Sequence, residues 1–198
     1  MIVAGIHGNE QVPVKYLKDN EIPFVLGNPK AYSQNKRCVD CDLNSSFGVS
    51  GTKYEVRRSQ RLRKILKAPV IDFHTFSCKS EPFAVIVDLK MLPMACKTGV
   101  KHVVYMNMNI KKGHALINYF DGVSVEVGHH DSGQAFYQMK KTLTAYNSGL
   151  VSKPKVYEVY DILHKKGKYI NFKKHGNFYP VLAGEKAYKF PGLKARLM

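Results

Sequence analysis

Four side chains that can bind a metal or move a proton follow, or lie within, short apolar runs of the chain. His7 and Glu10 come after the run IVAGI, His74 comes after VIDF, and Glu126 lies within VSVEVG. Short apolar runs of this kind predict buried strands. Because loops at the carboxyl ends of strands converge in α/β sheets, we expect these residues to form an active site.

The residue types indicate metal-assisted hydrolysis. Two histidines and one carboxylate, with a fourth position left for water, are a known ligand set for catalytic zinc. A second carboxylate that does not bind the metal can act as general base on that water. The His-x-x-Glu spacing is weak evidence by itself, since His7 can be a loop histidine and Glu10 a carboxylate favoured by a helix N-terminus. Glu126 is more informative, because a lone glutamate between valines is costly to bury without a partner.

Hydrophobic periodicity predicts the elements that must position these residues. We expect an α/β layer fold, because strands and helices are mixed before residue 150 and short strands follow it. A polar stretch without periodicity, residues 30–52, predicts a long functional loop. The expected strands are 2–6, 22–29, 68–75, 82–89, 102–108, 122–128, 155–163, 168–172 and 178–182, and the expected helices are 10–20, 53–67 and 132–150.

The bulk composition is that of a globular protein. The chain has 198 residues, 44% of them hydrophobic, which is enough for one packed domain with a small appendage. No apolar run approaches the roughly 20 residues of a membrane-spanning helix, so no membrane association is expected. The N-terminal sequence lacks the features of an export signal, and the four cysteines therefore predict reduced thiols in a cytoplasmic protein.

A formal net charge of +16 favours anionic partners. The basic residues are spread along the chain, as in RRSQRLRK at 57–64 and HKKGK at 164–168, and such runs are most often solvated faces. The aromatic–basic interleaving of a single-strand binding groove is not found, so we expect a small anionic substrate and no specific nucleic acid.

Taken in order, the motifs resemble those of the aspartoacylase and succinylglutamate desuccinylase family, relatives of the zinc carboxypeptidases, and most of all aspartoacylase. GIHGNE is similar to the family's first metal motif, and GNPKAYSQNKRCVDCDLNSSF to its block of asparagine–proline–alanine, arginine and aspartate–leucine–asparagine. KYEVRRSQ resembles the helix that follows, and DFHT the strand end with the last metal ligand. VSVEVGHHDSGQ is similar to the catalytic-glutamate motif, and YPVLAGEKAY to the segment whose tyrosine reaches the substrate. The likeness runs across nearly the whole chain.

The resemblance implies a zinc enzyme with one ion per chain. It also implies a carboxypeptidase-like three-layer α/β/α fold with a mixed sheet in residues 1–150, and a small β-rich segment in residues 151–198 that covers the site. Its general base acts on a metal-activated water, and an arginine stabilises the oxyanion at the scissile carbonyl. The residues it assigns are the metal ligands His7, Glu10 and His74, the catalytic residues Glu126 and Arg37, and the substrate-binding residues Asn44 and Tyr188.

Local sequence leaves two nearby roles open. Asn44 is equally well explained as a turn residue. Asp72 lies two residues before His74, so on a strand both side chains share a face. Asp72 is then either a carboxylate that orients this histidine or a structural aspartate.

The chain departs from the family at two places that hold the substrate. Ser45 stands where the family block continues with arginine, and Leu116 lies near the place of a second arginine. A serine cannot make the bidentate, charged contact with a carboxylate that an arginine makes. Lys111, Lys112 and His114 are candidate substitutes, and the sequence does not decide among them. The hydrolytic residues are present, while the specificity pocket is altered.

The resulting hypothesis is a zinc-dependent amidohydrolase that cleaves a small N-acyl amino acid, as aspartoacylase does. The alternatives are a peptidase that removes a C-terminal residue and a non-catalytic basic binding protein. Loss of the arginine at Ser45 weighs against the first, and the intact hydrolytic set against the second. Cys38 and Cys41 could instead belong to a zinc knuckle or redox pair. Homo-oligomerisation, the acyl group and the amino acid stay open.

Overall fold

The computed structural model describes residues 1–108, 110–130 and 132–198, which form two compact units. The first unit contains Met1–His74 and Asn109–Val125, and the second contains Thr75–Met108 and Glu126–Met198. Strands β3 (Val70–Phe76) and β6 (Gly122–His129) each pass from one unit into the other. Among the described residues, no helix combines the length and apolar character needed to cross a membrane.

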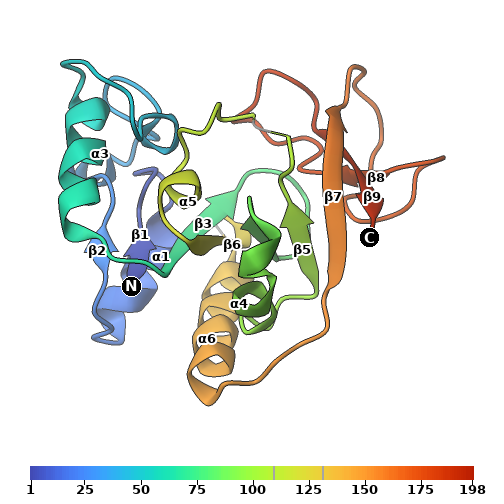
Figure 1. Cartoon of the computed structure of the whole chain (residues 1–198), viewed down its shortest axis with the longest axis horizontal. Coiled ribbons are helices and arrows are strands. Elements are labelled where there is room, and N and C mark those ends of the chain that lie inside the picture. The colour runs from blue at the N-terminus through green and yellow to red at the C-terminus, as the bar shows by residue number, and fades with distance from the viewer. Residues whose placement is uncertain (109, 131) are drawn as a thin grey trace. The chain divides into compact units, whose positions relative to one another are not determined.

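A parallel arrangement of strands forms the centre of the first unit (Figure 1). β1 (Ile2–Ala4) pairs in parallel with both β2 (Val25–Leu26) and β3, and the strand order in this unit is β2-β1-β3-β6. Every residue of β3 is buried, as expected for a strand covered on both faces. The helices of this unit are α1 (Gln11–Asp19), α2 (Pro29–Ser33), the 3-10 helix η1 (Leu43–Ser45), α3 (Tyr54–Ile65) and α5 (Leu116–Tyr119).

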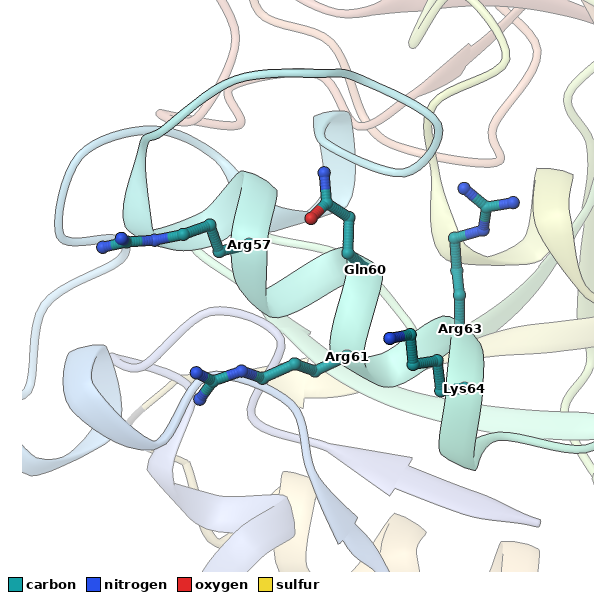
Figure 2. A pocket seen from close by; sticks show the side chains of 5 residues that line it. All are labelled: Arg57, Gln60, Arg61, Arg63 and Lys64. Carbon is teal, nitrogen blue, oxygen red and sulfur yellow. The ribbon is translucent and has the colours of Figure 1, made fainter.

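Helix α3 is amphipathic, with a buried inner face and a basic outer face. Val56, Ser59 and Leu62 recur at helical spacing and are buried. Figure 2 shows the outer side chains, which line an open cavity of about 680 Å³: Arg57, Gln60, Arg61, Arg63 and Lys64. All five are exposed, as the sequence predicted for this basic run.

The second unit contains a mixed sheet with strand order β4-β5-β7-β9-β8. β4, β5 and β7 are parallel, whereas β9 runs antiparallel to both β7 and β8. Its elements are β4 (Phe83–Ile86), the 3-10 helix η2 (Leu89–Met91), α4 (Leu92–Cys96), β5 (His102–Tyr105), α6 (Gly133–Ser148), β7 (Lys155–Ile162), β8 (Tyr179–Val181) and β9 (Leu193–Leu197).

Most predicted elements are present, and the exceptions are short. α6 ends at Gly149, which has φ +70° in the left-handed region that favours glycine at a helix end. The predicted loop at 30–52 contains α2 and η1, which are too short for periodicity to reveal. The predicted strand at 168–172 is wrong, because Phe172 has φ +63°, a left-handed conformation incompatible with a strand. Strand β9 was not predicted.

A buried glutamate of α3 holds the loop that contains Arg37 and Asp42. The Glu55 carboxylate is fully buried and accepts hydrogen bonds from the backbone N–H groups of Val39, Asp40 and Cys41 at 2.6, 3.0 and 3.1 Å. The side-chain amide of Asn28 donates to it as well, at 3.1 Å. Burial alone would raise the pKa of Glu55, but these hydrogen bonds to the charged form lower it below its ordinary value.

Replacing Glu55 with glutamine should therefore lower the free energy of unfolding by about 1.5–3 kcal/mol at pH 7, the range for hydrogen bonds to a charged group. Because the pKa of Glu55 is lower in the folded chain, its contribution is present above about pH 4.3 and is lost as the pH falls through the folded-state pKa. Denaturant unfolding of both proteins across pH should show the difference shrink on acidification. The control is Glu21→Gln, whose side chain is exposed. A difference independent of pH would contradict this role.

Candidate metal centre

His7 and Glu10 lie on a tight loop between β1 and α1. The backbone N–H of Glu10 donates to the carbonyl of His7 at 3.2 Å, which closes the loop. Gly8 allows the loop to approach α2, because a Cβ at this position would lie 2.1 Å from the carbonyl carbon of Ala31. Only glycine fits at this contact.

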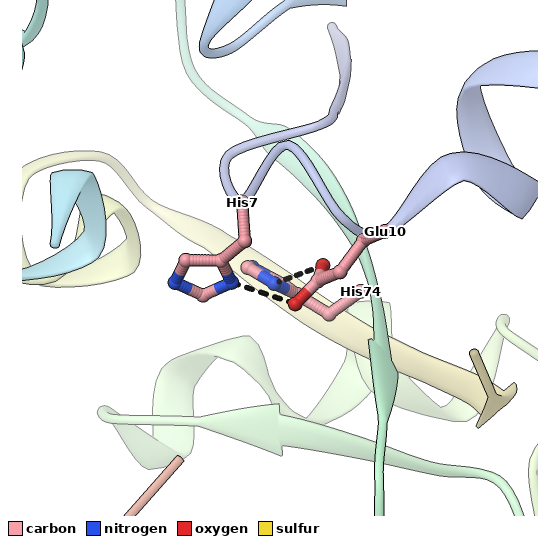
Figure 3. Close-up of side chains that lie close together, drawn as sticks. All are labelled: His7, Glu10 and His74. Atoms are coloured by element: carbon pink, nitrogen blue, oxygen red, sulfur yellow. Dashed lines mark hydrogen bonds and ion pairs between the residues drawn. The ribbon is translucent and has the colours of Figure 1, made fainter. Parts of the chain in front are cut away.

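The carboxylate of Glu10 lies between two imidazole rings (Figure 3). Its Oε1 is 2.6 Å from Nδ1 of His7, and its Oε2 is 3.0 Å from Nδ1 of His74. Glu10 precedes α1 but makes no side-chain hydrogen bond that caps the helix. Both oxygens of its carboxylate contact the histidine pair instead.

These three side chains are almost completely removed from solvent. The relative exposures of His7, Glu10 and His74 are 4%, 1% and 3%. Their ligand atoms lie within 4.8 Å of one another, and no other group of three potential metal ligands occurs among the described residues. Cys38 and Cys41 are thus not part of such a cluster in the residues that the structure covers.

The carboxylates next to the two histidines favour a positive charge within the cluster. Burial would raise the pKa of Glu10, but the adjacent His7 and His74 lower it well below its ordinary value. Burial would lower the pKa of His74, but Asp72 and Glu10 raise it well above its ordinary value. The adjacent carboxylates thus favour a positive charge at the histidine pair. A divalent cation would supply that charge, and two imidazole nitrogens with one carboxylate are a donor set that zinc prefers.

Each histidine also contacts a carboxylate through its other ring nitrogen. Nε2 of His74 lies 2.5 Å from Oδ2 of Asp72, and Nε2 of His7 lies 3.1 Å from Oδ1 of Asp42. Such contacts fix the ring orientation and direct Nδ1 towards the candidate metal position. The sequence left open whether Asp72 orients His74 or is a structural aspartate. Its contact with Nε2 favours the first of these roles. Sequence reasoning assigned no role to Asp42, although it lies between two predicted site residues, Arg37 and Asn44.

Arg37 and Asn44 belong to the same loop and both contact Asp42. Nη2 of Arg37 donates to Oδ2 of Asp42 at 3.1 Å, and Nη1 lies 4.0 Å from the carboxylate of Glu10. The backbone N–H of Asn44 donates to Oδ1 of Asp42 at 2.8 Å. The side-chain oxygen of Asn44 accepts from the backbone N–H of Leu116 at 2.9 Å. The first unit therefore brings together five of the seven predicted residues.

Glu126 and Tyr188, the other two predicted residues, belong to the second unit. Glu126 is half-buried in β6. Tyr188 stacks on Phe190, with 4.9 Å between ring centroids. Tyr188 also lines a cavity of about 710 Å³ whose wall includes five lysines: Lys79, Lys166, Lys168, Lys186 and Lys189. The roles of Glu126 and Tyr188 stay predictions.

Comparisons with known proteins identify the family. A family model, the succinylglutamate desuccinylase/aspartoacylase catalytic domain, matches residues 1–129. A probable aspartoacylase of Prochlorococcus marinus (strain MIT 9301) is 42% identical over 62 residues, which cover 26% of this chain and 21% of that protein. The chain therefore matches only about a fifth of the length of this curated relative.

Solved structures show the same fold. The succinylglutamate desuccinylase of Chromobacterium violaceum aligns with a TM-score of 0.72 at 16% identity, covering 100% of this chain and 83% of that chain. Murine aminoacylase 3 aligns with a TM-score of 0.71 at 16% identity, covering 100% and 94%. The predicted family and fold class are confirmed: a mixed α/β sheet with helices, as in the carboxypeptidase-like folds of these proteins. The division into domains at residue 150 stays a prediction.

The contact between Asp72 and His74 predicts an effect on metal affinity. Asp72→Asn keeps the side-chain shape but removes the charge behind the imidazole, so affinity for Zn²⁺ should fall by about 10- to 100-fold. Competition with a chromophoric chelator measures this affinity. The matched control is Asp88→Asn, because the Asp88 side chain is 52% exposed. Unchanged affinity in the Asp72 variant would mean that the metal does not bind through His74.

Proposed function

The chain belongs to the succinylglutamate desuccinylase/aspartoacylase catalytic domain family, and on this premise we propose that it is a zinc-dependent hydrolase that cleaves the amide bond of a small N-acyl amino acid. The observation that carries the proposal is the buried Glu10 carboxylate between the Nδ1 atoms of His7 and His74. His7, Glu10 and His74 would hold a zinc ion, which would act as a Lewis acid and lower the pKa of a bound water to about 7.

Arg37 is suited to stabilise negative charge on the substrate. Its guanidinium reaches both Asp42 and the edge of the metal cluster, and its side chain is 31% exposed, so a substrate can contact it. Asp42 fixes the guanidinium before substrate arrives, which reduces the cost of reorganisation during reaction. In the proposed mechanism Arg37 therefore donates to the oxygen of the scissile carbonyl as charge develops there.

Glu126 is assigned as the general base. It takes a proton from the attacking water and later returns a proton to the departing amine. Ser124 and Glu126 are two residues apart in β6, so their side chains leave the same face of the strand. The Ser124 hydroxyl lies 3.4 Å from Oδ2 of Asp72, the carboxylate behind His74.

The net charge of the chain and the two departures from the family bear on the substrate. A charge of +16 favours encounter with anions, and N-acyl amino acids carry at least one carboxylate. Because Ser45 and Leu116 replace arginines of related enzymes, we propose that N-acetylaspartate is a poorer substrate than for a typical aspartoacylase. We place the enzyme in the cytoplasm, where its four free thiols would stay reduced.

Glu126→Gln tests this function most directly. The variant should keep its zinc and its stability but lose about 100-fold or more of the wild-type rate, because glutamine cannot accept the proton. The assay is kcat/KM across the N-acetyl derivatives of Asp, Glu, Ala, Leu and His, with Glu81→Gln as an exposed control in the same unit. A zinc-loaded wild type that hydrolyses none of these would refute the proposed function. An active glutamine variant would remove Glu126 from the mechanism.

A further inference from the structure

One carboxylate oxygen of Asp42 accepts hydrogen bonds from two cationic side chains. Oδ2 accepts from Nη2 of Arg37 at 3.1 Å and from Nζ of Lys111 at 3.0 Å. Oδ1 is occupied by the ring nitrogen of His7 and the backbone N–H of Asn44. A carboxylate offers about four acceptor positions, so Asp42 has used all of them. One negative charge here faces two positive charges.

Lys111 also contacts the residue that replaces the family's arginine. Its Nζ lies 3.1 Å from the hydroxyl of Ser45, which stands 66 residues earlier in the chain. The ammonium therefore lies where the sequence predicted a missing positive charge. The side chain of Lys111 is only 21% exposed, so its ammonium is held by its neighbours and is not that of a freely solvated lysine.

The backbone around Lys111 is tied to the loop that contains Ser45. The N–H of His114 donates to the carbonyl of Lys111 at 2.9 Å, and the N–H of Phe47 donates to the carbonyl of His114 at 3.1 Å. Nδ1 of His114 lies 2.7 Å from the carbonyl oxygen of Phe47. These contacts hold the lysine's segment against the end of η1. His114 is thus part of this support and Lys112 is exposed, which leaves Lys111 as the cation.

Two cations share the single negative charge of Asp42: Arg37 and Lys111. Lys111 also contacts the hydroxyl of Ser45, which is a weaker partner for an ammonium than the carboxylate of a ligand would be. The pair of cations therefore favours a ligand that carries a carboxylate.

We propose that Lys111 binds the carboxylate of the amino-acid part of the substrate, in place of the arginine that Ser45 has replaced. This inference rests on the proposed function and names the residue that selects its substrate. Arg37, whose Nη1 lies 4.0 Å from the carboxylate of Glu10, is left for the scissile carbonyl. An ammonium makes a less directional contact than an arginine, so a simple monocarboxylate such as N-acetylalanine should be accepted.

The test measures binding without turnover. In zinc-loaded Glu126→Gln protein, calorimetry gives the Kd of N-acetylalanine and of its neutral carboxamide. Adding Lys111→Met should weaken binding of the acid by about 10- to 150-fold, the range for a hydrogen bond between charged groups, and that of the carboxamide by less than about twofold. Lys112→Met is the matched control, because Lys112 is the exposed neighbour, and should change neither value.

Two further measurements separate binding from structural support. Zinc content should be unchanged in the Lys111→Met variant. Adding Ser45→Arg to it should restore the preference for the acid, and the open cavity of about 530 Å³ lined by Ser45 and Asp42 gives room for this side chain. Equal weakening of acid and carboxamide would show that Lys111 only supports Asp42. A parent protein with no preference for the acid, or no effect of Lys111→Met, would also overturn the inference. Normal binding without wild-type hydrolysis would refute the proposed function alone.

Discussion

A buried carboxylate between two imidazoles is the interaction on which the site depends. Burying Glu10 unpaired would cost several kcal/mol, so the two rings must be present for the loop to fold as it does. Behind them stand Asp42 and Asp72, so that carboxylates and imidazoles alternate in one chain of contacts: Asp42, His7, Glu10, His74 and Asp72. Such a chain has more negative than positive charge until protons or a metal ion enter it. The polar core of the first unit is therefore suited to hold a cation.

The scaffold serves this chain of contacts by fixing its two ends. Asp72 and His74 are two residues apart on the fully buried strand β3, so the strand itself sets their spacing. Asp42 lies in an irregular loop and needs other support, which Glu55 provides through three backbone N–H groups. α3 thereby links its own packing to the position of the carboxylate behind His7. Lys111 and Arg37 then supply the positive charges next to the Asp42 carboxylate.

The sequence predicted the parts of the site that obey a local rule. His7 and Glu10 come directly after a short strand. Asp72 and His74 are two residues apart on another strand, so their side chains share a face. Asp42 was missed because its partner His7 is 35 residues away and no periodicity links them. Lys111 was one of three candidates, and only the folded chain brings its ammonium to Ser45. The predicted strand at 168–172 was wrong for a similar reason, since its conformation depends on contacts with residues distant in sequence. Phe172 packs in a cluster of rings with Phe83, His102 and Tyr157, and a left-handed backbone, invisible to hydrophobic pattern, directs it there.

The identity of the metal ligands is the central claim, and X-ray absorption at the zinc edge of the zinc-loaded protein tests it most directly. The account predicts a first shell of nitrogen and oxygen only, with distances of about 2.0–2.2 Å and the multiple-scattering signature of two imidazoles. The same spectrum should lose one imidazole in His74→Ala. A sulfur shell at about 2.3 Å would instead place the ion on cysteine and contradict the assignment to His7, Glu10 and His74.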